Sequence, residues 1–401
     1  MMARAPRERA GGTARIAIIK VGSSTLTGDS GRIEEPYLVD LARQIHAARA
    51  AGWRVVLVSS GSIPAGLETL GLPVERPRDM PTVQAAASVG QRALLSAYDK
   101  VFSLYGITIS LVLLTRRDTA DRHAYLHARD TFRRLLELGV VPIVNENDTV
   151  SVEQIRFGDN DTLAALVACM IDADRVVILS DIDGLYTANP QTDPDARLLS
   201  RVTHVTSRIM EGASGPGSTV GSGGMVTKLT SARVLEAAGI PLVICQGRAT
   251  DAVASALADE PSIGTFFEAR EKRHEMTPRK LWIALGNSVK GRLIIDEGAA
   301  CALVEGGSSL LGVGVVDVAG EFAAGDVIDV ATPAAFWLEV SRRSRPKRRA
   351  SRRGSSCIEM NWWCSNDEGI RIFRHPGARP RGQRGVARRR VKFGRGARSG
   401  P

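Results

Sequence analysis

The chain has no long apolar runs of the kind that cross membranes. No stretch approaches the roughly 20 apolar residues that a spanning helix needs, and the start, MMARAPRERAGGT, lacks the apolar segment of a secretory signal. We therefore expect a cytoplasmic protein that has no membrane partner. At 401 residues, with 44% hydrophobic and 24% charged residues, the chain has the composition of a globular protein with two domains.

Patterns for metal binding and for hydrolytic catalysis are absent as well. His123 and His127 lie four residues apart on an expected helix, but no third ligand follows at a useful spacing, so we predict no metal site. No Ser/His/Asp arrangement or reactive-cysteine context is present, which leaves hydrolase mechanisms without support. The cysteines are scattered without a CxxC pair, and we expect buried thiols rather than zinc ligands or disulfides. They are Cys169, Cys245, Cys301, Cys357 and Cys364.

The formal charge of +10 is carried by one end of the chain. Residues 341–401 contain 19 Lys/Arg against 3 Asp/Glu, a charge of +16, whereas residues 1–340 contain 34 against 40, a charge of −6. The basic character therefore says nothing about what the body of the protein binds.

Short β-branched runs alternate with helical patterns over residues 14–270. This alternation predicts βαβ units and a three-layer αβα sandwich with a largely parallel central sheet. The expected strands are 14–21, 54–60, 107–114, 140–146, 175–181 and 241–247. The expected helices are 35–51, 83–105, 121–138, 160–172 and 224–238.

A second unit follows a polar linker. We expect a flexible segment over 1–13, a domain over 14–270, and a small all-β unit over 278–333, where short apolar runs are separated by Gly and Asp. Residues 334–401 are rich in Arg, Ser and Gly and show no hydrophobic period, so we predict a disordered basic tail.

Two small-residue loops follow strands of the first domain. Lys20 ends a strand and precedes Gly22, whose bare backbone N–H could contact phosphate. Ser60 and Gly61 lie between a strand and a helix, where the helix N-terminus suits a carboxylate. Taken alone, a lysine after a strand is more often a solvated surface residue, and an ordinary N-cap serine explains the second loop equally well.

Two polar clusters lie about a dozen residues apart. Asn-Glu-Asn-Asp (145–148) follows a strand, and Gly-Asp-Asn-Asp (158–161) opens a helix after an expected hairpin. A site for an amino acid needs acceptors for its ammonium group and amide donors for its carboxylate, and these clusters offer both. Asn and Asp also favour turns and caps, which is the alternative explanation.

A glycine loop precedes the helix that contains Lys228. The loop is not a Walker A motif, because no Gly-Lys-Ser/Thr follows its glycines. Together with Ser180 and Asp181, which follow another strand, it could hold a nucleotide. Two lysines that approach from opposite sides would suit phosphoryl transfer, which depends on positioning and charge neutralisation. The loop residues are Ser222, Gly223, Gly224, Met225, Val226, Thr227 and Lys228.

These residues resemble the amino acid kinase family, and within it the glutamate 5-kinases, over about residues 14–333. The resemblance rests on motifs that occur in the family's order and spacing. They are KVGSSTLT, SSGSIPAGL, LLTRRD, NEND, GDND, SDIDGLYTANP and GSGGMVTK.

The resemblance implies transfer of the ATP γ-phosphoryl group to L-glutamate, the first step of proline synthesis, with Mg²⁺ as counter-ion and a homo-oligomeric assembly. Lys20 and Lys228 would flank the transferring group and Asp161 would orient them. Glutamate would be held by Ser60, Gly61, Asp148 and Asn160. ATP would be held by Lys20, Gly22, Ser180, Asp181 and residues 222–228.

The resemblance also identifies the second unit as the beginning and middle of a PUA domain. After Thr332-Pro333 the expected closing strand and final helical segment are missing, and we interpret the abrupt change of composition as a truncation or a frameshift. An incomplete barrel of this kind would leave an unpaired edge.

Two other functions stay open at this point. A kinase of the same family could act on another small carboxylate or phosphate acceptor. Alternatively, the PUA-like unit and the basic tail could make the chain an RNA-binding or regulatory protein, since basic segments bind nucleic acid through counterion release.

Overall fold

The computed structural model describes most of the first domain and parts of the second. By contacts, the chain divides into two units, Met1–Leu285 and Gly286–Pro401. Within the described residues, no helix is both long enough and apolar enough to cross a membrane. The described residues are 14–28, 32–73, 77, 79–115, 118, 121–150, 160–190, 192–213, 224–269, 291–304, 310–320, 327–332, 360–365 and 369–374.

The first unit is built on an eight-stranded sheet in the order β3-β4-β2-β1-β5-β7-β8-β6. β7 and β8 pair antiparallel, and every other pair of neighbouring strands in this sheet is parallel. The six strands expected from the sequence are thus confirmed. The strands are β1 (Arg15–Val21), β2 (Trp53–Ser59), β3 (Ile109–Leu114), β4 (Val141–Glu146), β5 (Arg175–Ser180), β6 (Arg201–Val202), β7 (Leu242–Gln246) and β8 (Thr265–Phe267).

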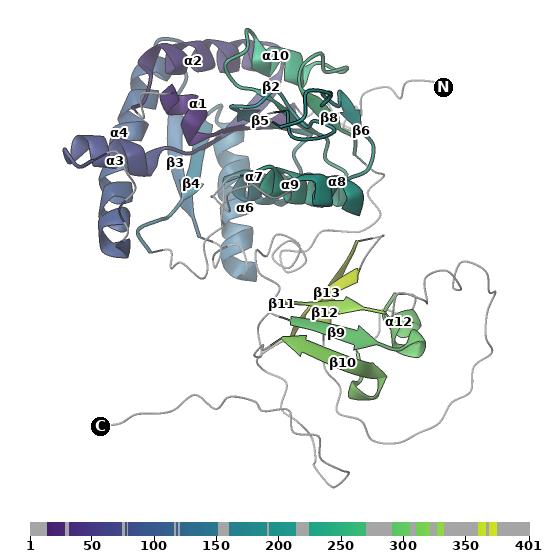
Figure 1. Cartoon of the computed structure of the whole chain (residues 1–401). Helices are drawn as coiled ribbons and strands as arrows, with labels where there is room; N and C mark the ends of the chain where they lie inside the picture. The colour runs from purple at the N-terminus through teal and green to yellow at the C-terminus, as the bar shows by residue number, and fades with distance from the viewer. Residues whose placement is uncertain are drawn as a thin grey trace, which may run out of the picture. The chain divides into compact units, whose positions relative to one another are not determined.

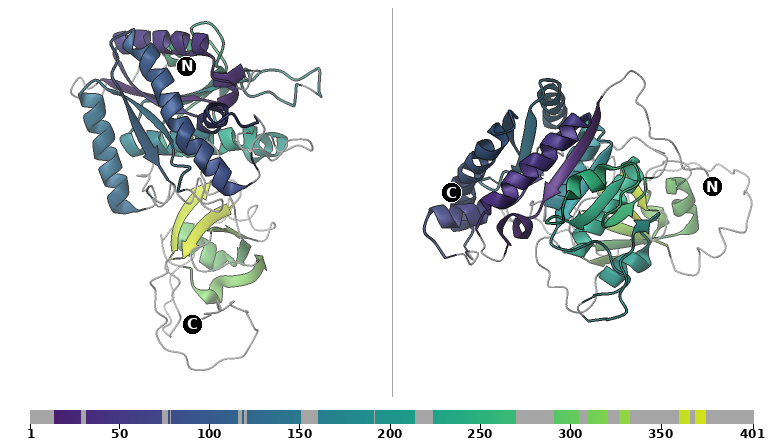
Figure 2. Two further views of the ribbon diagram at one scale, coloured as in Figure 1. Left: turned by 90° about the vertical axis from the view of Figure 1, so that its left-hand side faces the viewer. Right: turned by 90° about the horizontal axis from the view of Figure 1, so that it is seen from above.

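Helices cover both faces of this sheet, as Figures 1 and 2 show. The helix expected over 83–105 begins earlier, at Met80. Asp79 is its N-cap and accepts a hydrogen bond from the Thr82 backbone N–H at 3.0 Å, which satisfies one of the free donors of the first turn. The helices are α1 (Ser23–Thr27), α2 (Glu35–Ala50), α3 (Ser62–Thr69), α4 (Met80–Ser103), α6 (Arg122–Glu137), α7 (Asn160–Ile171), α8 (Ser207–Ala213), α9 (Met225–Ala238) and α10 (Ala252–Leu257).

Apolar packing on both faces of the sheet accounts for the three layers of the first unit. Alternate residues of β1, such as Ala17 and Ile19, pack with apolar side chains of α2, α4 and α10 on one face of the sheet. α7 lies on the other face and is almost wholly buried, because it contacts β1 and β5 as well as α9. Strands that are covered on both sides must be apolar throughout, which is why they read as continuous hydrophobic runs. The αβα sandwich predicted from the sequence is confirmed.

The second unit contains a five-stranded sheet in the order β10-β9-β11-β13-β12. Its small core is built around Leu293, Ile295, Leu303 and Val330. The expectation of an all-β unit was wrong in one respect, since residues 297–304 form a helix that contributes Leu303 to this core. The elements are β9 (Gly291–Ile295), α12 (Glu297–Val304), η3 (Gly312–Gly314), β10 (Val315–Gly320), β11 (Val327–Ala331), β12 (Met360–Ser365) and β13 (Gly369–Arg374).

The basic tail contains two strands, which corrects the prediction of disorder for those residues. β13 pairs antiparallel with β11 and with β12, so the edge of β11 that the sequence left unpaired is occupied. The segment Gly-Ile-Arg-Ile-Phe-Arg contains two isoleucines and a phenylalanine, residue types that favour strands. An average composition over the whole tail conceals this short group of strand-favouring residues. The remaining residues of 334–401 and the flexible segment predicted over 1–13 lie outside the described residues.

Candidate active site

The sequence-predicted residues meet where the central strands of the first unit end. In the sheet, β2 is the neighbour of β1 on one side, and β5 is its neighbour on the other side. The chain passes first from β1 to β2 and later returns to β5. Strand connections therefore leave β1 and β5 in opposite directions. Ligands of open α/β sheets bind at such a switch point, outside the carboxyl ends of the strands. Lys20 and Ser180 lie at these two strand ends.

Two lysines share one carboxylate at this edge. Lys20 Nζ lies 2.6 Å from Asp161 Oδ1, and Lys228 Nζ lies 3.1 Å from Asp161 Oδ2. Lys20 comes from β1, Asp161 from the first turn of α7 and Lys228 from the first turn of α9. The sheet and two helices thus bring together residues that are 67 to 208 positions apart in the sequence.

Burial makes this cluster chemically unusual. Lys20 is 4%, Asp161 0% and Lys228 5% exposed. Buried charges are costly unless they are paired, and removal of one partner leaves the other uncompensated. The three groups together carry one excess positive charge. Such a cluster is suited to an anion that brings negative charge to the lysines, and a phosphoryl group does so.

Asn160, the residue before Asp161, joins the two polar clusters seen in the sequence. Its Nδ2 donates to Ser59 O at 2.7 Å, to Ser60 Oγ at 2.9 Å and to Asn145 Oδ1 at 2.9 Å. Residues from β2, β4 and α7 are therefore held in one network. Asn145, at 3% exposure, belongs to this network, although the sequence-based prediction selected only Asp148 from its cluster.

The loop after β2 needs its glycine. Gly61 has φ +97° and ψ +4°, a left-handed conformation that residues with a side chain rarely adopt, and it is the N-cap of α3. This turn places Ser60 beside Asn160. Asp148 lies in the turn that follows β4, at the same edge of the sheet, and is half-buried. The predicted glutamate-binding residues therefore gather on the β2–β4 side of the lysine pair.

Tyr98 supports this loop from the core, which sequence reasoning did not foresee. Its hydroxyl lies 2.9 Å from Ser59 Oγ, and Ser59 Oγ also donates to Ser60 O at 3.0 Å. Burial raises the pKa of Tyr98, and the hydrogen bond to Ser59 opposes that rise only in part. The phenol therefore stays protonated at neutral pH. A tyrosine in an apolar helix face carries no sequence signal for this contact.

The β5 side holds the residues predicted to bind the nucleotide. Ser180 Oγ donates to Asp181 Oδ1 at 3.0 Å, and Asp181 O accepts from Gln246 Nε2 at 3.0 Å. The Gly22 N–H donates to Leu179 O at 3.3 Å, so the loop after β1 lies against β5. Gly22, Ser180 and Asp181 are thus brought to one side of the lysine pair.

The glycine loop before α9 is described only from Gly224 onward. Gly224 is the N-cap of α9, and Met225, Val226, Thr227 and Lys228 form its first turn. Thr227 donates through Oγ1 to Gly224 O at 2.7 Å, which secures this turn. Ser222 and Gly223 lie outside the described residues.

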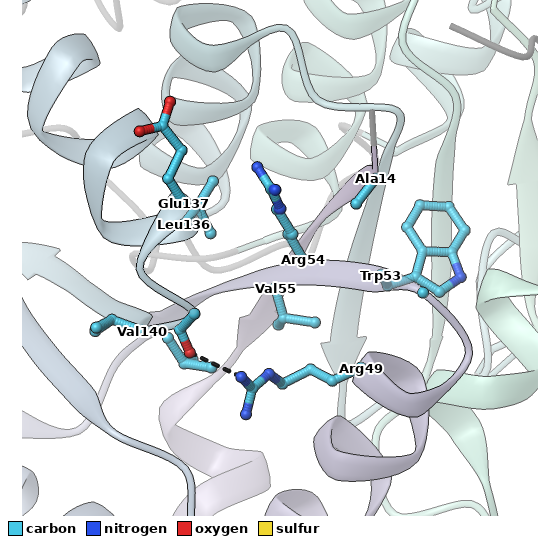
Figure 3. A pocket seen from close by; sticks show the side chains of 11 residues that line it. Ala14, Arg49, Trp53, Arg54, Val55, Leu136, Glu137 and Val140 are labelled. Atoms are coloured by element: carbon cyan, nitrogen blue, oxygen red, sulfur yellow. Dashed lines mark hydrogen bonds between the residues drawn. The ribbon is translucent and has the colours of Figure 1, made fainter. Parts of the chain in front are cut away.

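A hollow of about 320 Å³ lies at the other end of the strands, where β1, β2 and β4 begin (Figure 3). Arg54 points into it, and Arg49 donates to Gly139 O at 2.7 Å beside it. None of the predicted site residues lines this hollow. The lysine cluster, and not this hollow, is therefore the candidate active site.

Comparison with known proteins identifies the family of the chain. The chain matches the amino acid kinase family over residues 15–246 and the PUA domain over residues 291–336. It is 49% identical over 321 residues to a glutamate 5-kinase of Moorella thermoacetica, with 80% of this chain and 84% of that protein covered. Glutamate 5-kinases of Ralstonia pickettii and of an Azoarcus species are 44% and 46% identical, with 86% of this chain and 92% and 93% of those proteins covered. The chain belongs to the amino acid kinase family, among the glutamate 5-kinases, and carries a PUA domain after the kinase region.

Proposed function

We propose that this chain transfers the γ-phosphoryl group of ATP to the side-chain carboxylate of L-glutamate, giving ADP and γ-glutamyl phosphate for proline synthesis. The observation that carries the proposal is the buried cluster of two lysines on one carboxylate. In phosphoryl transfer the protein mainly positions the reactants and neutralises charge on the moving group. Two lysines from different elements, Lys20 of β1 and Lys228 of α9, can both position the phosphoryl group and neutralise its charge.

Each part of the site has a role in this proposal. Lys20 and Lys228 stabilise negative charge on the transferring phosphoryl group, and Asp161 keeps both ammonium groups in place. Glutamate is held by Ser60, Gly61, Asp148 and Asn160. ATP is held by Gly22, Ser180, Asp181 and the loop that runs from Ser222 into α9.

Magnesium would enter with the nucleotide. Mg²⁺ usually binds through substrate phosphates, one or two carboxylates and water, rather than through a cage of protein side chains. The described residues contain no group of three or more His, Cys, Asp or Glu that could form such a cage. The cation would neutralise charge on the phosphates, which complements the two lysines.

The acceptor is tested by ADP release from the purified chain with ATP and Mg²⁺. We expect release with L-glutamate and none above background with aspartate, N-acetylglutamate or UMP. Hydroxylamine should trap the product as a hydroxamate, because acyl phosphates react with this nucleophile. Release with another acceptor and not with glutamate would refute the proposed substrate.

The assembly and the cellular location are part of the same proposal. We expect a homo-oligomer in the cytoplasm. Light scattering coupled to size-exclusion chromatography measures the assembly, and a monomeric mass with full activity would refute the need for oligomers.

Replacement of Asn160 by alanine should affect glutamate far more than ATP. The change removes the amide that donates to Ser59 O, Ser60 Oγ and Asn145 Oδ1. It leaves these acceptors, of which those on Ser59 and Asn145 belong to buried residues, without their donor, a loss worth about 1–3 kcal/mol. We expect the KM for glutamate to rise at least about tenfold, while the KM for ATP stays within about twofold. Steady-state kinetics with each substrate varied in turn measures both, and an equal rise of the two constants would contradict the assignment.

A further inference from the structure

The segment at the end of β7, residues 246–248, links the two loops predicted to hold ATP. Gln246 Nε2 donates to Asp181 O at 3.0 Å, on the β5 side. Gly247 N donates to Ser180 O at 2.7 Å. Arg248 reaches in the other direction, to α1, which follows Lys20 and Gly22. None of these three residues was selected from the sequence.

Gly247 lets this segment approach α1 closely. A Cβ at this position would lie 2.6 Å from Thr25 Cγ2 and 2.9 Å from Leu179 Cβ. No real Cβ is found so close to other carbon atoms. Thr25 itself donates through Oγ1 to Leu179 O at 3.4 Å. The side chains of Thr25 and Leu179 therefore pack directly on the Gly247 backbone, and there is no room for a side chain at this position.

The guanidinium of Arg248 holds α1 on its outer side. Nη2 donates to Thr25 O at 2.9 Å, and Nη1 donates to Glu34 Oε2 at 2.7 Å. The guanidinium carbon also lies 5.2 Å from the centre of the Tyr37 ring, within the range of a cation–π contact. Arg248 thus contacts α1, the residue before α2 and α2 itself.

The geometry suits arginine specifically. A guanidinium is planar and presents several N–H donors in a fixed fork, so it can bond a backbone carbonyl and a carboxylate at the same time. Thr25 O is in the last turn of α1, where a positive charge is favourable. The side chains of Arg248 and Glu34 are 39% and 35% exposed, so solvent screens this pair and it contributes little to folding stability. Its effect should be on the position of α1.

We propose that Arg248 is a positioning residue for the nucleotide: through Thr25 and Glu34 it holds α1, and with it the Gly22 loop, against the Ser180–Asp181 loop. The side-chain contacts of Arg248 are with Thr25, Glu34 and Tyr37, outside the buried lysine cluster. Within that cluster, Lys20 is held by its place in β1 and by its ion pair with Asp161. Its loss should therefore weaken ATP use and leave the chemistry and glutamate recognition largely unchanged. This inference rests on the proposed function.

The test is steady-state kinetics of the full-length chain with Arg248→Ala, Arg248→Lys and Glu34→Gln. For Arg248→Ala we expect the KM for ATP to rise about tenfold, with the KM for glutamate within twofold and kcat within threefold. Arg248→Lys should give an intermediate KM for ATP, because an ammonium group can replace only part of the fork. The double variant Glu34→Gln with Arg248→Ala should have the same KM for ATP as Arg248→Ala alone, since both changes break the same Arg248–Glu34 interaction.

Arg43→Ala is the matched control. Arg43 also bridges two elements at the surface, with Nη2 2.8 Å from Asp251 Oδ1, but it lies on α2 and contacts none of the nucleotide loops. It should leave both KM values unchanged. An unchanged KM for ATP in Arg248→Ala, or an equal rise of both KM values, would overturn the inference. An inactive wild-type chain would instead refute the proposed function, so the two failures are distinguishable.

Discussion

Replacement of Lys228 by alanine is expected to lower kcat for glutamate phosphorylation at least a hundredfold. Lys228 Nζ lies 3.1 Å from Asp161 Oδ2 in a site where all three charged groups are buried. Loss of one preorganised donor to a charge that develops in the transition state costs about 3 kcal/mol. Asp161 keeps its partner Lys20, so the carboxylate is not left alone in the core. Turnover of ATP with saturating glutamate and Mg²⁺ measures the effect.

Two further variants separate catalysis from folding. Lys228→Met keeps most of the buried stem and removes only the charge, so it should lose as much activity as Lys228→Ala. Lys100→Ala removes an exposed lysine that pairs with Glu35, and it should keep normal turnover. Thermal unfolding shows whether each variant is folded. Near-normal turnover in a folded Lys228→Ala chain would refute the proposed role of this lysine.

Replacement of Gly90 by alanine is expected to destabilise the first unit by at least about 2 kcal/mol, although alanine is the better helix former. In an exposed helix this change should stabilise by roughly 0.5–1 kcal/mol. Here a Cβ on Gly90 would clash with the carbonyl oxygen of Ser62, and a Cβ on Gly66 would clash with that of Ala86. α3 and α4 therefore meet backbone to backbone, and overpacking of such a contact typically costs 1–3 kcal/mol.

Urea denaturation followed by circular dichroism measures this change, with Ser88→Ala as the control. Ser88 lies on the exposed side of the same helix, so the control should be neutral or slightly stabilising. α3 begins directly after Ser60 and Gly61, so a displaced α3 should also raise the KM for glutamate. Unchanged stability in Gly90→Ala would contradict the close helix packing.

The sheet was predictable from the sequence because most of its expected strands are buried on both faces, with β3 at the edge as the exception. Each expected strand is a continuous run of β-branched and other apolar residues, and each helix between them has its own period. The strand ends at Lys20, Ser60, Asn145 and Ser180 could be foreseen as one edge, since parallel strands present the same ends to one side of a sheet. The short strands β6 and β8 carry too few residues for such a pattern.

The second unit was less predictable. β12 and β13 are six residues each and lie in a segment dominated by Arg, Ser and Gly. Their strand character depends on pairing: β13 pairs with residues of β11 that lie 40 to 46 positions earlier in the chain, and β12 pairs with β13. Composition averaged over a long window conceals a contact of this kind.

The sequence by itself determined where the candidate residues stand: the lysines, Asp161, the amide and hydroxyl side chains and the glycines lie at strand ends and helix starts. Only the tertiary structure decided how they act on one another. The distances from Asp161 to its two lysines, the three bonds of Asn160, and the contacts of Tyr98 and Arg248 join residues from different elements. Local patterns encode which face of an element is buried, whereas contacts between distant elements depend on how those faces pack together.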